Sequence, residues 1–125
     1  MIEKLYLINL CLIITHEIDS AYWKEWEMFY LPGGIQFFNI INFLLIVVLI
    51  WGYRSVVLKT RSGFNYSIAM SSIGIIAFII HGIFMLNGYE QFTLPVSMLI
   101  LVVCFITSIS QLIRTFMTKK IFTNV

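Results

Sequence analysis

Charged residues are scarce in this sequence, and their scarcity excludes an ordinary soluble domain. Of the 125 residues, 11% are charged and 60% are hydrophobic, and the mean hydropathy is +0.94. Soluble globular domains usually contain about 25% charged and about 45–50% apolar residues. A chain this apolar is therefore expected to fold in lipid rather than in water.

Cysteine is scarce as well: only Cys11 and Cys104 occur, both inside apolar runs. No metal-ligand spacing links them, so we expect both to be buried free thiols. The sequence also lacks a low-complexity segment, a Gly/Ser linker and a clear internal repeat. We therefore expect a single membrane domain over residues 1–125.

Long apolar runs dominate the chain, and four of them are long enough to cross a bilayer. A helix rises about 1.5 Å per residue, so about 20 residues cross about 30 Å of hydrocarbon. Backbone hydrogen bonds must be satisfied within lipid, which favours helices, and the period-2 alternation of a membrane barrel is absent. We predict an all-α, integral membrane four-helix bundle, with helices at about residues 5–23, 35–53, 64–86 and 94–116.

Turn-forming residues separate these runs. The two prolines lie at such breaks, Pro32 before two glycines and Pro95 at the expected first turn of the last helix. Residues 54–63 form a short, polar, basic loop between the second and third runs. The first run is expected to remain an uncleaved helix, because a small-residue cleavage pattern is missing. After it, the amphipathic residues 22–30 predict a short helix in the membrane interface.

The charges are distributed asymmetrically along the predicted topology. With the N-terminus in the cytoplasm, four spans place all basic residues except Lys24 on the cytoplasmic side, in agreement with the positive-inside rule. All acidic residues except Glu3 then lie toward the outside. We expect both termini to be cytoplasmic and the lipid bilayer to be the main partner. The net charge of +2 hides a dipolar molecule, so it does not indicate nucleic-acid binding.

Several residues near the outer surface have a simple interpretation. The aromatic residues of the stretch 22–30, together with Tyr89 and Phe92, are expected to form an aromatic belt at the outer interface. Glu25, Glu27 and Glu90 are interpreted as solvated surface charges.

The remaining ionisable residues gather in the outer half of the predicted bundle. His16 and Asp19 lie on one helical stripe, whereas Glu17 points about 100° away from His16. The third helix places His81 at a depth similar to that of His16. Ionisable residues at membrane depth are costly and usually face the interior or a water-filled pocket. We therefore predict an outward-facing polar site built from His16, Glu17, Asp19 and His81.

The second helix adds a stripe of amides beside this site. Gln36, Asn39 and Asn42 are three residues apart and share one face in its first two turns. Amides at this depth usually join helices by hydrogen bonds. We expect them to form a supporting polar shell.

The residue types favour a metal ion or a small polar ligand as the occupant. Histidine and carboxylate ligands suit zinc or another divalent first-row ion. His16, Asp19 and His81 would supply three ligands, with Glu17 as a base or as a partner of a ligand. The stretch is not the zinc-protease motif HExxH, because Ser20 stands where that motif has its second histidine.

Two other functions stay open. The chain is similar in outline to the small multidrug resistance transporters, with four helices and a glutamate in the first. A proton-coupled carrier of small molecules or cations would use Glu17 or His16 and would act as a homo-oligomer. However, the glutamate lies in the outer half, and that family's later-helix glycine pattern is absent. The third hypothesis is a structural or accessory membrane subunit whose polar side chains join helices.

One stretch of the sequence resembles a known group of proteins. The residues that carry the resemblance are His16-Glu17-Ile18-Asp19, followed by Tyr22-Trp23, Glu25-Trp26-Glu27 and Leu31-Pro32-Gly33-Gly34-Ile35-Gln36. This stretch resembles a family of small bacterial four-span membrane proteins of unknown function. The resemblance covers mainly the first two helices, about the first 50 residues. It implies a protein of the bacterial inner (plasma) membrane and supplies no activity.

Overall fold

The computed structural model describes residues 1–123, and within that range it is helical without a strand. The four long helices are α1 (Ile2–Tyr22), α3 (Gly34–Val57), α4 (Arg61–Leu86) and α5 (Pro95–Met117). Two short helices, α2 (Glu25–Met28) and α6 (Lys120–Thr123), complete the order. The all-helical expectation is confirmed, and so are the short helix after the first long one and Pro95 in the first turn of α5.

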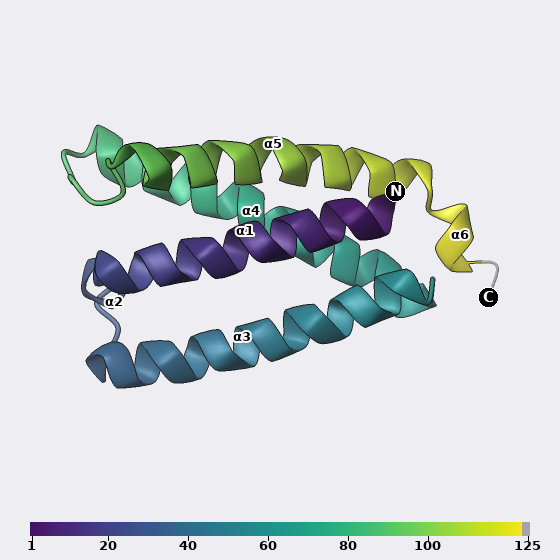
Figure 1. Ribbon diagram of the computed structural model, residues 1–125, viewed down its shortest axis with the longest axis horizontal. Helices are drawn as coiled ribbons and strands as arrows, with labels where there is room; N and C mark the ends of the chain where they lie inside the picture. The colour runs from purple at the N-terminus through teal and green to yellow at the C-terminus, as the bar shows by residue number, and fades with distance from the viewer. Residues whose placement is uncertain (124–125) are drawn as a thin grey trace.

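The four long helices lie side by side, with α1 between α5 and α3 and with α4 behind them in Figure 1. One end of the bundle carries α2 and the connection between α4 and α5; we call it the α2 end. The opposite end carries the N-terminus, the turn between α3 and α4, and α6; we call it the α6 end. The basic side chains that the sequence analysis places together fall at the α6 end.

Three of the long helices, α3, α4 and α5, are long and apolar enough to cross a membrane. The fourth predicted span, α1, is not among them. With 21 residues it has the length, but it carries ionisable side chains near both ends, which lower its hydropathy; these are Glu3, Lys4, His16, Glu17 and Asp19. The expectation of a membrane protein thus has the support of three helices, and the four-span bundle is not confirmed.

Large apolar side chains cover the outward faces of these helices. Phe43 on α3 is 66% exposed and Leu99 on α5 is 60% exposed, and many aliphatic neighbours are exposed as well. Soluble monomers rarely expose apolar surface on this scale, because it would cause aggregation. Such a surface is stable when lipid tails cover it.

The turn between α3 and α4 is shorter than the sequence predicts. Residues 54–63 were expected to form a loop, but α3 continues to Val57 and α4 begins at Arg61. The two helices approach closely here, since a Cβ added to Gly63 would lie 2.6 Å from the carbonyl oxygen of Ser55. Thr60 supports the turn by donating a hydrogen bond from its hydroxyl to the same carbonyl at 3.2 Å.

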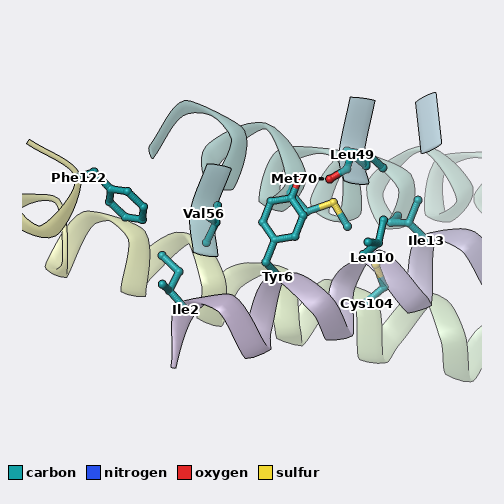
Figure 2. Packing of buried hydrophobic residues seen from close by; sticks show 9 residues of the cluster. All are labelled: Ile2, Tyr6, Leu10, Ile13, Leu49, Val56, Met70, Cys104 and Phe122. Atoms are coloured by element: carbon teal, nitrogen blue, oxygen red, sulfur yellow. Dashed lines mark hydrogen bonds between the residues drawn. The ribbon is translucent and has the colours of Figure 1, made fainter. Parts of the chain in front are cut away.

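A buried apolar cluster holds the middle of the bundle and the α6 end together (Figure 2). Tyr6 of α1 is fully buried, and its hydroxyl donates a hydrogen bond to the carbonyl oxygen of Leu49 in α3 at 3.0 Å. Phe122 of α6 is also fully buried in this cluster. The sequence does not predict α6, because four residues are too few to show a helical pattern.

A buried polar network joins α1, α4 and α5. Asn9 donates from Nδ2 to Oε1 of Gln111 at 2.6 Å, and Gln111 donates from Nε2 to the carbonyl oxygen of Ser67 at 3.1 Å. Thr107 donates from its hydroxyl to Oδ1 of Asn9. Asn9, Gln111 and Ser67 are fully buried. The hydrogen bonds of the network therefore take the place of those that these polar groups would make to water.

The two cysteines have different surroundings. Both are free thiols, as expected, but only Cys104 is buried. Cys11 is exposed, so the expectation of two buried thiols is wrong for this residue. The reason is helical phase: the buried stripe of α1 includes Asn9, Leu10 and Ile13, and Cys11 points away from it.

Candidate functional site

Two buried histidines meet at the α2 end of the bundle. His16 belongs to the buried stripe of α1 and is 4% exposed, whereas His81 lies five residues before the end of α4 and is 3% exposed. Their ring centroids are 4.9 Å apart, and the rings are nearly perpendicular, at 78°. Two side chains that are 65 residues apart in the sequence are thus neighbours.

The carboxylate beside these histidines is Glu25 of α2. Its Oε1 lies 3.2 Å from Nε2 of His81, and the residue is 8% exposed. The interpretation of Glu25 as a solvated surface charge is therefore wrong. The chain reverses at Lys24, whose φ of 54° is left-handed, and α2 then folds over the end of the bundle with Glu25 inward. Glu27, by contrast, is exposed and lies 3.8 Å from Lys24.

The environment of Glu25 favours its ionised form. Burial by itself raises the pKa of this carboxyl, but the contacts with His81 and Ser20 and the nearby His16 outweigh burial. The net effect holds the pKa of Glu25 below its usual value of 4.5. Glu25 is therefore a carboxylate at neutral pH.

Phe92, from the connection between α4 and α5, covers the two histidines. Its ring centroid lies 4.0 Å from that of His81 and 5.4 Å from that of His16, and Phe92 is fully buried. The prediction that Phe92 belongs to an outer aromatic belt is therefore wrong. A left-handed φ of 63° at Phe92 lets the connection turn its side chain back into the bundle.

His16, Glu25 and His81 together have the donor set of a metal site. One ligand atom from each of the three buried residues lies within 4.8 Å of the other two. The Nδ1 atoms of His16 and His81 are buried and have no hydrogen-bond partner among the residues that the structure describes. A buried imidazole nitrogen without a partner is unfavourable, so these two rings are not explained by hydrogen bonding within the described residues alone.

A cavity of about 220 Å³ adjoins this cluster. The three residues of the cluster and Glu17 form its polar wall, and aliphatic side chains of α4, such as Ile73 and Ile76, form the rest. The cavity is large enough for several water molecules or for one small ligand.

The other predicted site residues fall outside the cluster. Asp19 is half-buried and is not part of the three-residue group, so Glu25 takes the place that Asp19 was expected to hold. Glu17 is half-buried and lines the cavity without belonging to the cluster. One feature of the sequence could have singled out Glu25: it precedes the apolar Met28 by three residues, and the structure buries both on one face of α2.

The amide stripe of α3 borders a second hollow. Asn39 and Asn42 line it together with Glu17, and its volume is about 260 Å³. Asn42 is half-buried beside Glu17, whereas Asn39 and Gln36 are exposed. Gln36 lines neither of these two hollows.

Comparison with known proteins gives the chain a family. The model of DUF6713, described as a family of unknown function, matches residues 2–118. The chain belongs to this family. No curated protein matches the chain, and no solved structure does. The match to DUF6713 covers nearly the whole chain, whereas the resemblance noted in the sequence covers mainly the first two helices. Membership in this family assigns no activity.

Proposed function

We propose that this member of DUF6713 is a four-span protein of the bacterial inner membrane that binds a divalent metal ion, zinc being the leading candidate, at the α2 end. The observation that carries the proposal is the group His16, Glu25 and His81, whose ligand atoms lie within 4.8 Å of one another inside the protein. Two imidazoles and one carboxylate are a common donor set for catalytic zinc, which keeps a further position for water or substrate.

The fit to zinc requires a small adjustment. Zinc bonds of about 2.0–2.2 Å separate tetrahedral ligand atoms by about 3.4 Å. The three donors therefore need to approach one another by up to about 1.4 Å to share one ion. The adjoining cavity leaves room for a fourth ligand. Glu17 in its wall is the nearest candidate for a general base toward a bound water, and a small polar ligand in the same cavity would use the same groups.

The location of the site depends on α1 crossing the membrane. This helix runs antiparallel to α3 and packs along α5, α3 and α4, all of the length and hydropathy of a span (Figure 1). A helix packed against three such neighbours lies at the same depth as they do. The basic α6 end then faces the cytoplasm with both termini, and the metal site lies toward the outer face.

The carrier hypothesis has weaker support. Ile13 lines the cavity and also belongs to the buried apolar cluster with Met70 and Cys104. This apolar layer separates the site from the α6 end, so the arrangement favours a site open to one side. A carrier would also need the homo-oligomer that the hypothesis predicts. The third hypothesis is a structural subunit. In that case the Glu25–His81 pair would serve only to hold α2 on the bundle.

A zinc titration distinguishes these functions. We expect the full chain in detergent to bind one zinc ion in competition with a chelator. Glu25→Gln and His81→Ala should each weaken the zinc affinity by at least about 100-fold. Removal of a residue that only hydrogen-bonds to a metal ligand already lowers metal affinity by about 10–100-fold, and removal of a ligand itself should cost more. Glu27→Gln is the matched control, since Glu27 is on the same short helix and is exposed. Equal affinities for all four proteins would overturn the proposal, and loss of thermal stability without any zinc binding would favour the structural subunit.

A further inference from the structure

The two hollows at the α2 end share a wall. Glu17 lines both the cavity beside the metal cluster and the hollow between α1 and α3. The first is lined by α1, α2 and α4 and the second by α1 and α3, so the two hollows adjoin at Glu17. We call the pair the Glu17 cleft.

The cleft opens sideways because α3 stands away from the bundle along part of its length. Residues 39–48 of α3 include no buried residue, whereas Leu49, Gly52, Ser55 and Val56 are buried nearer the α6 end. At Gly52 the approach to α4 is so close that an added Cβ would lie 2.7 Å from the Tyr66 ring. At the α2 end, Phe38 of α3 is buried, and its ring centroid lies 5.3 Å from that of Trp26.

The walls of the cleft change from polar to apolar with depth. Glu17, Asn39 and Asn42 lie within about 12 Å of the α2 ends of their helices, at 1.5 Å per residue. The walls deeper in the bundle are aliphatic, including Ile46 of α3 and Ile73 and Ile76 of α4. This order matches an outer-leaflet lipid, with its head group at the surface and its chains below.

The carboxyl group of Glu17 indicates which head group fits. A carboxylate at this depth is costly without a cationic partner. A second copy of the chain in the same orientation would bring only Lys24 to the α2 end, and Lys24 pairs with Glu27. The other basic residues belong to the α6 end. Within the described residues no lysine or arginine is therefore offered to Glu17, and a cationic group from another molecule would complement it.

We propose that the Glu17 cleft binds one membrane lipid with a primary-amine head group, taken laterally from the outer leaflet. The ammonium group lies against Glu17 and donates to the side-chain carbonyl oxygens of Asn39 and Asn42, and one acyl chain follows Ile73 and Ile76. The proposal goes beyond metal binding, because lipid binding here does not require an ion in the neighbouring cluster.

Native mass spectrometry of the full chain tests the lipid site. The protein is titrated with phosphatidylethanolamine and with phosphatidylcholine of identical acyl chains, each with zinc and with a chelator. We expect one phosphatidylethanolamine to bind about tenfold more tightly than phosphatidylcholine, as a charge-assisted hydrogen bond implies. Glu17→Gln should remove this preference, and Glu27→Gln should keep it. If phosphatidylethanolamine binds in the presence of chelator and zinc does not bind at all, the result would contradict the metal site and leave the lipid site standing.

A second measurement uses the unmodified protein, so it does not depend on the folding of a variant. A phosphatidylethanolamine with a photoreactive group midway along one chain should label residues 73–80 of α4. Labelling confined to the α5 surface would overturn the proposal, as would equal affinity for the two lipids. A disulfide between two copies of Asn39→Cys, formed in high yield in a lipid-free dimer, would show that a second copy fills the cleft instead.

Discussion

Glu25, His16 and His81 are buried within reach of one another in a part of the chain where burial of charge is expensive. A buried carboxylate is stable only with a partner, and His81 supplies it at 3.2 Å. The second histidine brings a further nitrogen to the same place, together with an Nδ1 that has no partner in the described residues. A purely structural ion pair would not require His16.

The Glu25–His81 contact should make the metal-free protein sensitive to acid. The pKa of Glu25 is held below 4.5, so its stabilising effect is present above that value and is lost as the pH falls through the folded-state pKa. The titratable groups around Glu25 are His81, His16 and Glu17. We expect wild-type protein in chelator to have a higher unfolding midpoint than Glu25→Gln at about pH 6.

Thermal unfolding of both proteins over a pH series checks this expectation. The difference in midpoint should narrow as the pH falls below 4.5. A difference that stays constant to about pH 3 would show that Glu25 does not act through its charge.

Gln111 is the centre of the buried polar network. Gln111→Ala would leave the amide of Asn9 without its 2.6 Å partner. An unsatisfied buried polar group costs about 1–3 kcal/mol, so we expect a loss of that size in the free energy of unfolding. Ser110→Ala is the control: Ser110 is exposed on the same helix, and its hydroxyl donates to the carbonyl oxygen of Ile106 one turn away. Equal stability of the two variants in denaturant titrations would contradict this role.

The sequence predicted some of these residues and missed others for identifiable reasons. Polar side chains at His16 and His81 have no local explanation inside apolar helices, so the pattern singled them out. Glu25 and Phe92 were misassigned because their direction depends on left-handed backbone at Lys24 and at Phe92 itself. Left-handed conformations are rare for residues other than glycine, and the sequence does not predict where they occur.

At the scale of the elements, α4 and α5 owe their close packing to Gly74. A Cβ at this position would collide with the hydroxyl of Ser108 and lie 2.9 Å from the sulfur of Cys104. We expect Gly74→Ala to lower the free energy of unfolding by about 1–3 kcal/mol, the usual cost of overpacking. Thermal or denaturant unfolding measures the effect.

Gly82 provides the matched control on the same helix. An added Cβ there has nothing within 4 Å. Gly82→Ala should leave stability unchanged or raise it by up to about 1 kcal/mol, because alanine favours the helix. Destabilisation of equal size at both positions would show that close packing at Gly74 is not the cause.

The elements themselves were the most predictable part of the fold. Apolar runs located all four long helices, and Pro95 located the start of α5. The turn between α3 and α4 was misjudged because Arg54 and Arg61 were interpreted as loop residues, whereas both continue helices. Polarity is a weak guide to helix ends at a membrane surface, since water satisfies a charged side chain on a helix as well as on a loop.

At the scale of the whole molecule, the proposed orientation predicts opposite accessibility of the two ends. In a background with Cys11→Ser and Cys104→Ser, a cysteine at Glu27 should react with an impermeant maleimide added to intact cells. A cysteine at Lys59, in the turn at the α6 end, should react only after the cells are opened. Labelling of Lys59→Cys in intact cells would reverse the orientation and place the metal site on the cytoplasmic side.

The arrangement of the bundle brings together what the sequence keeps apart. Helix direction alone predicted that His16 and His81 lie at similar depth, and the antiparallel packing places their rings 4.9 Å apart. The choice between Asp19 and Glu25 could not be made from helix direction, because it depends on how α2 folds over the bundle. The tertiary fold, not the local pattern, therefore decides the third ligand.

X-ray absorption spectroscopy of the zinc-loaded protein tests the metal site most directly. We expect one zinc per chain with nitrogen and oxygen ligands at about 2.0–2.2 Å, and an outer-shell signal from two imidazole rings. Glu25→Gln should lower the zinc content, and Glu27→Gln should not. A sulfur ligand, a shell without imidazole, or zinc content that is unchanged by both His16→Ala and His81→Ala would contradict the site formed by His16, Glu25 and His81.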